Sequence, residues 1–370
     1  MAGDTSEGAG HLLSPTALPR RHQAGLLGLL ALAVAPLLVS DIDTLKLTSA
    51  LFLAVYAMSW DAVSGYTGRI SFGHALFFAA GGYTTAILNV HYGVSPVVGI
   101  PLGILVAALA GLAIGVPALR VRGPYLSLIT LVAPLIVLQL FVYFSGFTGG
   151  EIGLLGVEQF TPDPTANYYI AFGVFLFALA VFLAVTRSDA GSVFTAIRED
   201  EDAVVAAGLN PAKFKIFAFV LSAAVGGFAG AVFAHTVAAG ALTPSQILAL
   251  TVSIEVIIAP ILGGMGTITG AAVGGLFFWL LRDQLRQMET VIPLLDVAVK
   301  QVDLLVFLLI TLGFLFFLPE GIVPRLLREA RRLGSQPSEA TTTDGGRSPL
   351  EASLDGFRDQ FERLRGGDRK

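Results

Sequence analysis

Two short glycine-containing motifs combine residues that could bind a polar solute through exposed backbone groups. Residues 65–71 read GYTGRIS and residues 263–269 read GGMGTIT, so G-x-x-G-x-I is followed by a hydroxyl residue in each. Glycine-interrupted segments in both halves of a chain are typical of a transporter binding site near the midplane of the membrane. The alternative is close helix packing, because glycine lets two backbones approach, and the pattern alone does not decide between them.

The motifs and their surroundings supply the residues that we place beside a solute path. Those residues are Gly65, Gly68, Ser71, Gly73, His74, Glu255, Gly263, Gly264, Gly266 and Thr269. His74 could line the path or hydrogen-bond to a glycine-rich turn. Glu255 lies deep in an apolar run, where an unpaired charge is costly, so we expect it to face a partner or water. We interpret Arg69 as an anchor at the membrane interface.

The chain shows none of the sequence patterns of a catalyst. It has no Walker A loop, no H-E-x-x-H and no G-x-S-x-G, and its five histidines lie on separate segments. Its lack of cysteine excludes disulfides and thiolate metal sites. We therefore expect no catalytic residue, no metal and no cofactor, and a chain that is not an enzyme.

Composition indicates an all-α integral membrane protein. Of the 370 residues, 54% are hydrophobic and 14% charged, and the mean hydropathy is +0.76, which is too apolar for a soluble domain. Nothing in the charge pattern suggests a nucleic-acid partner. A membrane helix needs about 20 mostly apolar residues. Ten runs are candidates: 24–40, 47–64, 72–90, 96–119, 124–145, 168–186, 214–235, 248–262, 271–281 and 304–318.

Nine spans are also possible, because the runs on either side of Gly263 could form one broken helix. Counting ten spans places four Lys/Arg clusters on one side of the membrane. In loop 146–167, on the other side, every charged residue is an acid. The positive-inside rule then predicts that both termini are cytoplasmic in a multi-pass protein of the cell membrane. The expected organisation is a polar N-terminal tail over 1–23, a membrane domain over 24–320, and a basic and polar tail over 321–370 that is largely disordered.

The polar loop between the sixth and seventh runs predicts a short helix on the cytoplasmic surface. Helix-forming residues extend from Thr195 to Ala207, and Gly208 and Pro211 follow as stop signals. Its charges could dock a partner or simply be solvated. The candidate docking residues are Thr195, Ala196, Arg198, Glu199, Asp200, Glu201 and Gly208. In the next run, the small residues between Ala223 and Gly230 provide two faces for close helix contact.

Five motifs in order resemble the permease subunits of ABC importers for branched-chain amino acids, in particular the member of the pair with the longer intracellular tail. They are GYTGRISFGHALFFAAGGYTTAIL at 65–88, VRGPYLSLITL at 121–131, TGGEIGLLGV at 148–157, AIREDE at 196–201 and ILGGMGTITG at 261–270. The resemblance extends over about residues 47 to 320. It departs from the family at Ser192, at Pro260 and after the Thr-Gly-Gly loop, which leaves the solute open.

The resemblance implies that the loop around Arg198 is a coupling helix seated on a cytoplasmic ATPase, and that ATP is hydrolysed by that separate subunit. It further implies a second homologous permease subunit, two ATPases, an extracytoplasmic solute-binding protein, and branched-chain amino acids or a relative such as urea, an amide or another amino acid as solute. The alternative is a secondary transporter driven by an ion gradient. That mechanism needs intramembrane acids, and only Glu255 and Asp61 are candidates.

Overall fold

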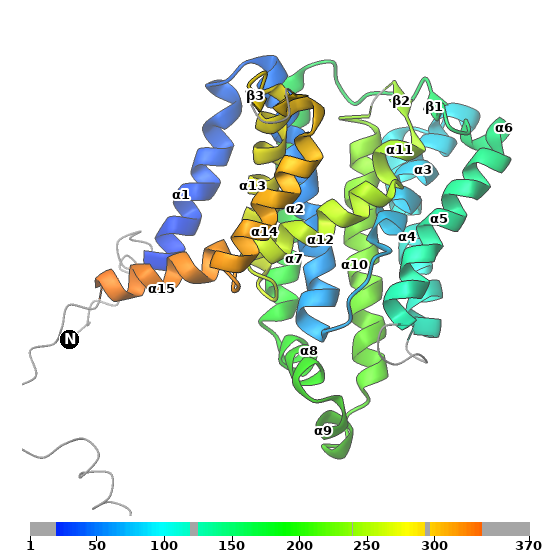
Figure 1. Cartoon of the computed structure of the whole chain (residues 1–370). Coiled ribbons are helices and arrows are strands. Elements are labelled where there is room, and N and C mark those ends of the chain that lie inside the picture. Colours follow the sequence, from blue (N-terminus) through cyan, green and yellow to red (C-terminus); the bar gives the residue numbers. More distant parts are fainter. Residues whose placement is uncertain (1–19, 119–124, 239, 293–296, 335–370) are drawn as a thin grey trace, which may run out of the picture. The chain divides into compact units, whose positions relative to one another are not determined.

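The computed structural model describes residues 20–118, 125–238, 240–292 and 297–334, and it confirms an all-α fold. Contacts divide the chain into two units, 1–327 and 328–370, and of the second unit only 328–334 are described. Residues 350–364, whose apolar side chains recur at helical spacing in the sequence, lie outside the described residues. Figure 1 shows the element order.

The long helices are α1 (Arg20–Val34), α2 (Asp41–Thr67), α3 (His74–Tyr92), α4 (Pro96–Ala118), α5 (Tyr125–Tyr143), α7 (Pro164–Thr186), α10 (Pro211–Ala234), α12 (Leu250–Gly263), α13 (Ile268–Gln287), α14 (Asp303–Phe317) and α15 (Ile322–Gly334). Shorter elements are η3 (Ala35–Leu37), α6 (Ser145–Thr148), α8 (Asp189–Glu199), α9 (Glu201–Ala206), α11 (Pro244–Ile247) and η4 (Val299–Gln301). Two-residue strands pair as β1 (Leu154–Leu155) with β2 (Ala241–Leu242), and β3 (Val291–Ile292) with β4 (Val297–Ala298).

Each of the ten predicted apolar runs overlaps a helix, but fewer helices meet a strict standard of length and apolar character. Six segments do in the described residues, and a seventh is counted if α14 and the start of α15 form one bent span. The six are α2, α4, α5, α7, α10 and the segment Pro244–Gly263, which contains α11 and α12. α1 is shorter, and α3 and α13 do not reach the same standard. α12 and α13 are two helices that pack on each other across the Gly264–Thr267 turn.

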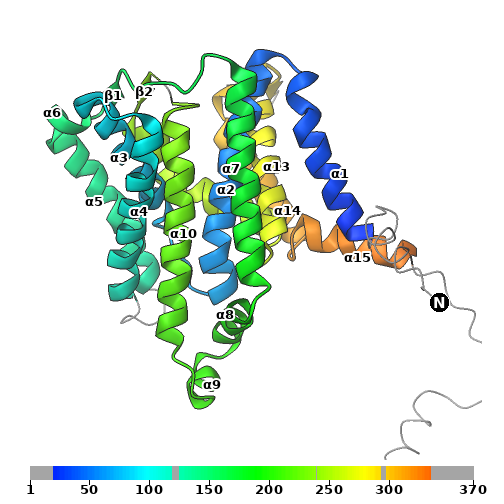
Figure 2. The ribbon, with the colours of Figure 1, turned by 180° about the vertical axis from the view of Figure 1, so that it is seen from behind.

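α2 is the central helix of the first unit. It contacts α7, α10, α12 and α13. In its apolar 18-residue stretch 89% is buried, compared with 22% in the corresponding stretch of α4 and 17% in that of α5. Figures 1 and 2 show α2 inside the bundle and α5 at its edge. A membrane protein has no water-driven reason to bury apolar helices. The apolar outer faces of α4 and α5 therefore suit lipid or another subunit.

Close helix contacts use the small residues expected from the sequence. A methyl group on Gly82 of α3 would lie 3.0 Å from the carbonyl oxygen of Gly230 in α10, and one on Gly111 of α4 would lie 2.5 Å from the Cβ of Ala223. The expected contact faces of α10 are thus confirmed. Larger side chains at these positions would force α3, α4 and α10 apart.

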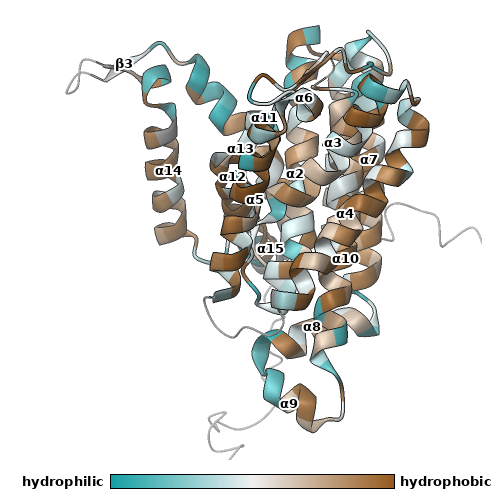
Figure 3. Cartoon of the chain, turned by 90° about the vertical axis from the view of Figure 1, so that its right-hand side faces the viewer, coloured by the Kyte–Doolittle hydropathy of each residue, from teal (hydrophilic) through white to brown (hydrophobic). Residues whose placement is uncertain are grey.

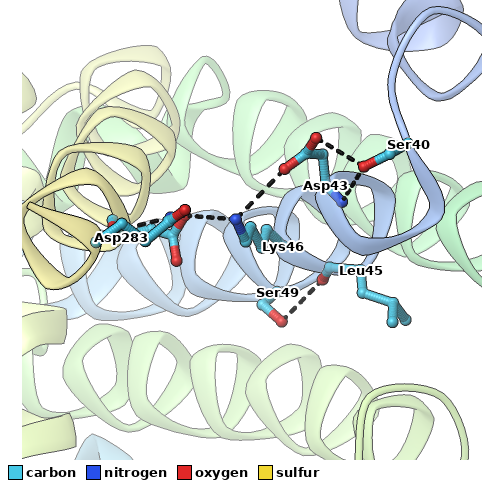
Figure 4. Close-up of polar contacts among 7 residues, drawn as sticks. Ser40, Asp43, Leu45, Lys46, Ser49 and Asp283 are labelled. Carbon is cyan, nitrogen blue, oxygen red and sulfur yellow. Dashed lines mark hydrogen bonds and ion pairs between the residues drawn. The ribbon is translucent and has the colours of Figure 1, made fainter.

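Polar groups gather at the two ends of the bundle. Figure 3 shows hydrophobic residues along the long helices and hydrophilic residues at α8, α9 and the opposite loops. At the end opposite α8, Ser40 caps α2 by accepting a hydrogen bond from the backbone N–H of Asp43 at 3.3 Å. Figure 4 shows Lys46 there, with its Nζ 3.3 Å from both Asp43 and Asp283. These contacts tie the start of α2 to α13.

Two helices extend into the segments that the sequence assigns to the tails. α1 begins at Arg20, inside the predicted N-terminal tail, and α15 continues to Gly334, inside the segment expected to be largely disordered. The polar composition of the C-terminal segment as a whole concealed the helical spacing of its first residues. Residues 1–19 and 335–370 lie outside the described ranges.

Candidate functional site

The first glycine motif forms the end of the central helix. α2 ends at Thr67, and Gly68 follows with a φ of 69°, in the left-handed region that favours glycine. A methyl group on Gly65 would lie 2.7 Å from the backbone nitrogen of Gly266. The motif therefore places a second backbone directly against the last turn of α2.

The second glycine motif supplies that backbone. The turn between α12 and α13 contains Gly266, which has a φ of 77°. The backbone N–H of Gly266 donates a hydrogen bond to Oδ1 of Asp61 on α2 at 2.7 Å, and Asp61 is fully buried. The structure thus joins two motifs that lie far apart in the sequence. The sequence indicates Asp61 only as an acid for an ion-driven mechanism, although its position four residues before Gly65 places it on the same face of α2.

Arg198 connects the polar loop to both motifs. Its Nη1 donates a hydrogen bond to the carbonyl oxygen of Gly65 at 2.9 Å. A methyl group on Gly266 would lie 2.8 Å from the same nitrogen, and one on Gly68 would lie 2.9 Å from Cγ of Arg198. The last turn of α8, the end of α2 and the α12–α13 turn therefore meet at one guanidinium group. We call Asp61, Gly65, Gly68, Arg198 and Gly266 the glycine junction.

An ionic cluster lies beside the glycine junction. Glu201, at the start of α9, pairs with Arg69 and accepts a hydrogen bond from Nζ of Lys215 at 2.5 Å. Burial raises the pKa of Glu201, but the hydrogen bonds and charges of Lys215 and Arg69 outweigh burial and hold that pKa below its usual value. The ionised carboxylate therefore holds α9 to the ends of α2 and α10. Arg69 is thus an ion-pair partner of α9, a role that its sequence context did not reveal.

The polar loop contains two helices where the sequence predicts one from Thr195 to Ala207. α8 and α9 are separated by Asp200, which has an extended backbone with φ −155° and ψ 102°. Its side chain accepts hydrogen bonds from the backbone N–H groups of Asp202 and Ala203, each at 3.0 Å. Asp200 thus caps α9 and breaks the predicted helix. Gly208 follows with a φ of 80°, as expected for a helix stop.

The candidate docking residues face in two directions. Arg198 and Glu201 reach inward to the bundle, whereas the side chain of Glu199 is 69% exposed. Thr195 is half-buried and donates a hydrogen bond to the carbonyl of Gly191. The exposed residues of the loop include Ala196, Glu199, Asp200, Asp202, Ala203, Val205, Ala206, Gly208 and Leu209. We call these residues the outer face of α8–α9.

Ser71, Gly73 and His74 are buried in helix contacts. Nε2 of His74 lies 2.9 Å from Oγ of Ser222 on α10. The carbonyl oxygen of Ser71 accepts a hydrogen bond from Nε1 of Trp60 at 2.6 Å. A methyl group on Gly73 would lie 2.5 Å from a backbone carbonyl of α5. In this conformation these residues satisfy polar groups between α2, α3, α5 and α10.

The remaining residues of the second motif support the α12–α13 turn. Gly264 has a φ of 126°. A methyl group on Gly321 would lie 2.5 Å from the Cα of Gly264. Gly263 is packed against the backbone of Gly270 so tightly that a side chain has no room. Thr269 is exposed on α13. The turn is therefore fixed by contacts on several sides.

Glu255 lies in a different polar cluster. It is two helical turns before the α12–α13 turn and pairs with Arg282 of α13. Arg282 also lies 3.9 Å from Asp303 of α14, which pairs with Arg286 at 3.1 Å. The expectation that Glu255 faces a partner is confirmed, but the structure does not bring it to the glycine junction.

Within the described ranges, no three His, Asp or Glu side chains gather as a metal site would require.

At the end of the bundle opposite the glycine junction, the loop that begins with Thr148 folds back on the chain. Leu154 and Leu155 pair with Leu242 and Ala241, and Oγ1 of Thr148 donates a hydrogen bond to the carbonyl of Phe141 at 2.5 Å. This loop is an ordered part of the surface farthest from α9 in Figure 1.

The fold and site define a helical membrane protein whose polar loop is bonded to buried glycine turns. The sequence profile of the family "Branched-chain amino acid transport system / permease component" matches residues 45–315, and the chain belongs to that family. It is therefore a permease subunit of ABC importers, and ATP hydrolysis belongs to a separate subunit.

Individual relatives agree with this assignment. The high-affinity branched-chain amino acid transport permease protein LivM of Salmonella typhimurium is 31% identical over 297 residues, covering 71% of this chain and 68% of the relative. LivM of Escherichia coli is 31% identical over 296 residues with the same coverage. A probable LivM of Methanocaldococcus jannaschii is 26% identical over 286 residues, covering 71% and 81%. No solved structure matches this chain.

Proposed function

We propose that this permease assembles with a second, homologous permease, two cytoplasmic ATPases and an extracytoplasmic binding protein, and that it imports branched-chain amino acids. The family and the names of the relatives support this solute class. The apolar outer faces of α4 and α5 suit contact with a second permease. Urea, amides and other amino acids are the competing solutes. Uptake into vesicles that contain the purified complex, measured over a panel of these compounds, tests the assignment, and no preference for leucine, isoleucine or valine would contradict it.

The observation that carries the coupling mechanism is the bond from Arg198 to Gly65 beside Gly266. Because α8 contacts the glycine junction directly, a displacement of α8–α9 by a closing ATPase shifts the end of α2 relative to the α12–α13 turn. We assign ATPase docking to the outer face of α8–α9. Its exposed Val205 and Leu209 provide an apolar centre, and its acids provide a charged rim.

The docking assignment is tested by co-purification. Replacing Val205 and Leu209 with serine is expected to reduce ATPase recovery with the permease strongly, because the apolar centre of an interface supplies most of its affinity. Exposed Leu38 and Ile42, at the end of the bundle opposite α8, provide a matched control when replaced with serine. Equal ATPase recovery in the two variants would contradict the assignment.

We place the solute path beside the glycine junction, where close backbones expose carbonyl and N–H groups. The buried contacts of Ser71 and His74 require that these helices separate in another transport state. Since the chain has no cysteine, single cysteines at Ser71, His74 and Thr269 can be labelled with a water-soluble thiol reagent without background. We expect Ser71 and His74 to react only in one nucleotide state. Absence of labelling at Ser71 and His74 in every state would assign these residues to helix packing alone.

We propose that the α8–α9 end is cytoplasmic, because Arg69, Arg198 and Lys215 lie there and Glu151 and Glu158 lie at the other end. A membrane-impermeant thiol reagent added to intact cells should label a cysteine at Glu151 but not a cysteine at Glu199. The ion-driven alternative gains no support from its two acids, since Asp61 already binds Gly266 and Glu255 already pairs with Arg282. Uptake that persists without ATP and is abolished by ionophores would favour that alternative.

A further inference from the structure

α15 separates apolar and basic residues along its length. It extends from Ile322 to Gly334, immediately after α14. At 3.6 residues per turn, its register gathers the apolar residues on one arc and the arginines on the opposite arc. The apolar arc contains Ile322, Val323, Leu326, Leu327, Ala330 and Leu333, and the basic arc contains Arg325, Arg328, Arg331 and Arg332.

The start of α15 is fixed to the end of a membrane helix. Nη1 of Arg325 donates a hydrogen bond to the carbonyl of Phe317, the last residue of α14, at 2.6 Å. A methyl group on Gly264 would lie 2.6 Å from Cδ of Pro324. The first turn of α15 thus begins at the boundary of the apolar α14 and rests on the α12–α13 turn that contains Gly266.

The apolar arc is partly uncovered: Leu326 is exposed, whereas Ile322, Val323 and Leu327 are half-buried. Leu326 is 63% exposed, and Phe316 and Phe317 at the end of α14 are 81% and 70% exposed. Isolated exposed apolar residues are common, but these three lie at the point where a membrane helix ends. Apolar surface at that depth contacts the boundary between headgroups and acyl chains.

The charge of α15 is local rather than a property of the whole chain. The protein has a net charge of −4, yet α15 contains four arginines and the single acid Glu329. Guanidinium groups bind phosphate oxygens with two hydrogen bonds. Basic residues at a membrane surface attract anionic lipids, and each contributes about a five-fold preference.

We propose that α15 is an interfacial helix that binds the surface of an anionic bilayer. Its apolar arc inserts beside the acyl chains, and its arginines bind the phosphates of anionic headgroups. Because Gly264 and Pro324 are in contact, lipid binding by α15 also supports the turn that forms one side of the glycine junction. This surface and its lipid partner are independent of which solute the transporter carries.

The depth of α15 in a bilayer tests the proposal directly. A cysteine at Leu326 on the apolar arc, or at Arg328 on the basic arc, is labelled with a fluorophore in the full chain with its partner subunits. The complex is placed in nanodiscs of phosphatidylcholine, with or without phosphatidylglycerol, that contain an acyl-chain quencher. We expect strong quenching at Leu326 and weak quenching at Arg328, with the Leu326 signal larger in the anionic bilayer and reduced by 1 M salt, where the Debye length falls to about 3 Å.

Charge variants separate lipid binding from apolar contact. In the Leu326 cysteine background, the triple variant Arg328→Gln, Arg331→Gln and Arg332→Gln should lower the ratio of docked to undocked α15 on the order of 100-fold. The matched variant with lysine at the same three positions keeps the charge and should retain quenching in anionic discs. Arg325 is left unchanged because it bonds to Phe317.

Three results would overturn the proposal. One is equal quenching in neutral and anionic discs. Another is quenching that survives the three glutamine substitutions. The third is protection of the Leu326 label by the ATPase subunits in lipid-free detergent, which would identify a protein as the partner of this helix.

Discussion

Two regions of the molecule place charged groups against membrane helices, but they do so in different ways. At the glycine junction, Arg198 and Asp61 bind backbone groups of Gly65 and Gly266. In the cluster of Glu255, Arg282 and Asp303, side chains pair with other side chains across α12, α13 and α14. The first region joins a polar loop to the bundle, and the second joins helices within it.

The difference indicates separate roles for the two regions. A side chain that binds a backbone carbonyl at a helix end moves that helix end when its own helix moves, so the glycine junction can transmit a displacement of α8. Buried ion pairs between parallel helix faces resist separation, and removing one partner leaves an uncompensated charge. We therefore expect changes at the glycine junction to affect transport, and changes at Glu255 and Arg282 to affect stability.

The largest expected effect comes from adding side chains at the glycine junction. Gly266→Val should abolish uptake, because the residue has a φ of 77° and a β-carbon would lie 2.8 Å from Arg198. Uptake is measured in vesicles after normalising to the amount of folded protein. Gly173→Val, where nothing lies within 4 Å, is the control. Normal uptake by the Gly266 variant would remove the glycine junction from the mechanism.

Breaking the second cluster should affect folding first. The side chains of Arg282 and Glu255 are only 10% and 13% exposed, so Arg282→Gln leaves a nearly buried carboxylate without its partner. We expect the free energy of unfolding to fall by about 3–5 kcal/mol. A lower thermal midpoint of the purified chain checks this. The double variant that also contains Glu255→Gln removes both charges and should recover much of the loss. If Arg282→Gln instead left the midpoint unchanged and stopped transport, Glu255 would belong to the solute path.

The ionic cluster of Glu201 gives a pH dependence of intermediate size. The pKa of this carboxyl is lower in the folded protein than its ordinary 4.5, so its ion pairs stabilise α9 fully above that pH and lose this contribution as pH falls through the folded value. A fluorescent label on a cysteine at Asp202 should keep a constant, restricted anisotropy from neutral pH to about pH 5 and become mobile in stronger acid.

The control for that experiment is Glu201→Gln, which cannot ionise. Its label should be more mobile than the parent label at neutral pH and should show no acid transition. Loss of restriction in the parent protein well above pH 5, or an acid transition that persists in the glutamine variant, would assign the docking of α9 to other contacts.

The smallest effect is expected at the exposed end of α2. Lys46→Gln removes ion pairs with Asp43 and Asp283 whose partners are 53% and 22% exposed. Solvent screening makes such pairs weak, so we expect uptake and the thermal midpoint to equal those of the parent. A clear loss of uptake would show that the start of α2 also belongs to the coupling mechanism.

The sequence predicted the helices better than the contacts between them. Apolar runs located the helices, because each membrane helix must present apolar side chains to lipid or to a neighbouring helix. The predicted helix stop at Gly208 was also correct. The break at Asp200 was missed, since capping by a side chain competes with strong helix propensity on both sides. α15 was not predicted, because the polar average composition of residues 321–370 conceals the helical spacing at their start.

Sequence spacing also identified both glycine motifs but not their meeting point. Contact between Gly65 and Gly266 depends on how α2, α12 and α13 pack, which no local pattern specifies. Residues Arg198 to Glu201 form one charged run in the sequence. Only the turn at Asp200 and the positions of Gly65, Arg69 and Lys215 determine which of these charges face inward.

The ratio of solute imported to ATP hydrolysed tests the central role of Arg198 most directly. In vesicles that contain the complete transporter, Arg198→Ala should keep ATPase assembly and ATP hydrolysis but lower the ratio at least several-fold, because a hydrogen bond from a charged group contributes about 1.5–3 kcal/mol. The neighbouring Glu199→Ala removes the exposed ion pair with Arg198 but leaves the hydrogen bond from Arg198 to Gly65, and should keep the parent ratio. An unchanged ratio in the Arg198 variant, with assembly intact, would contradict coupling through the glycine junction.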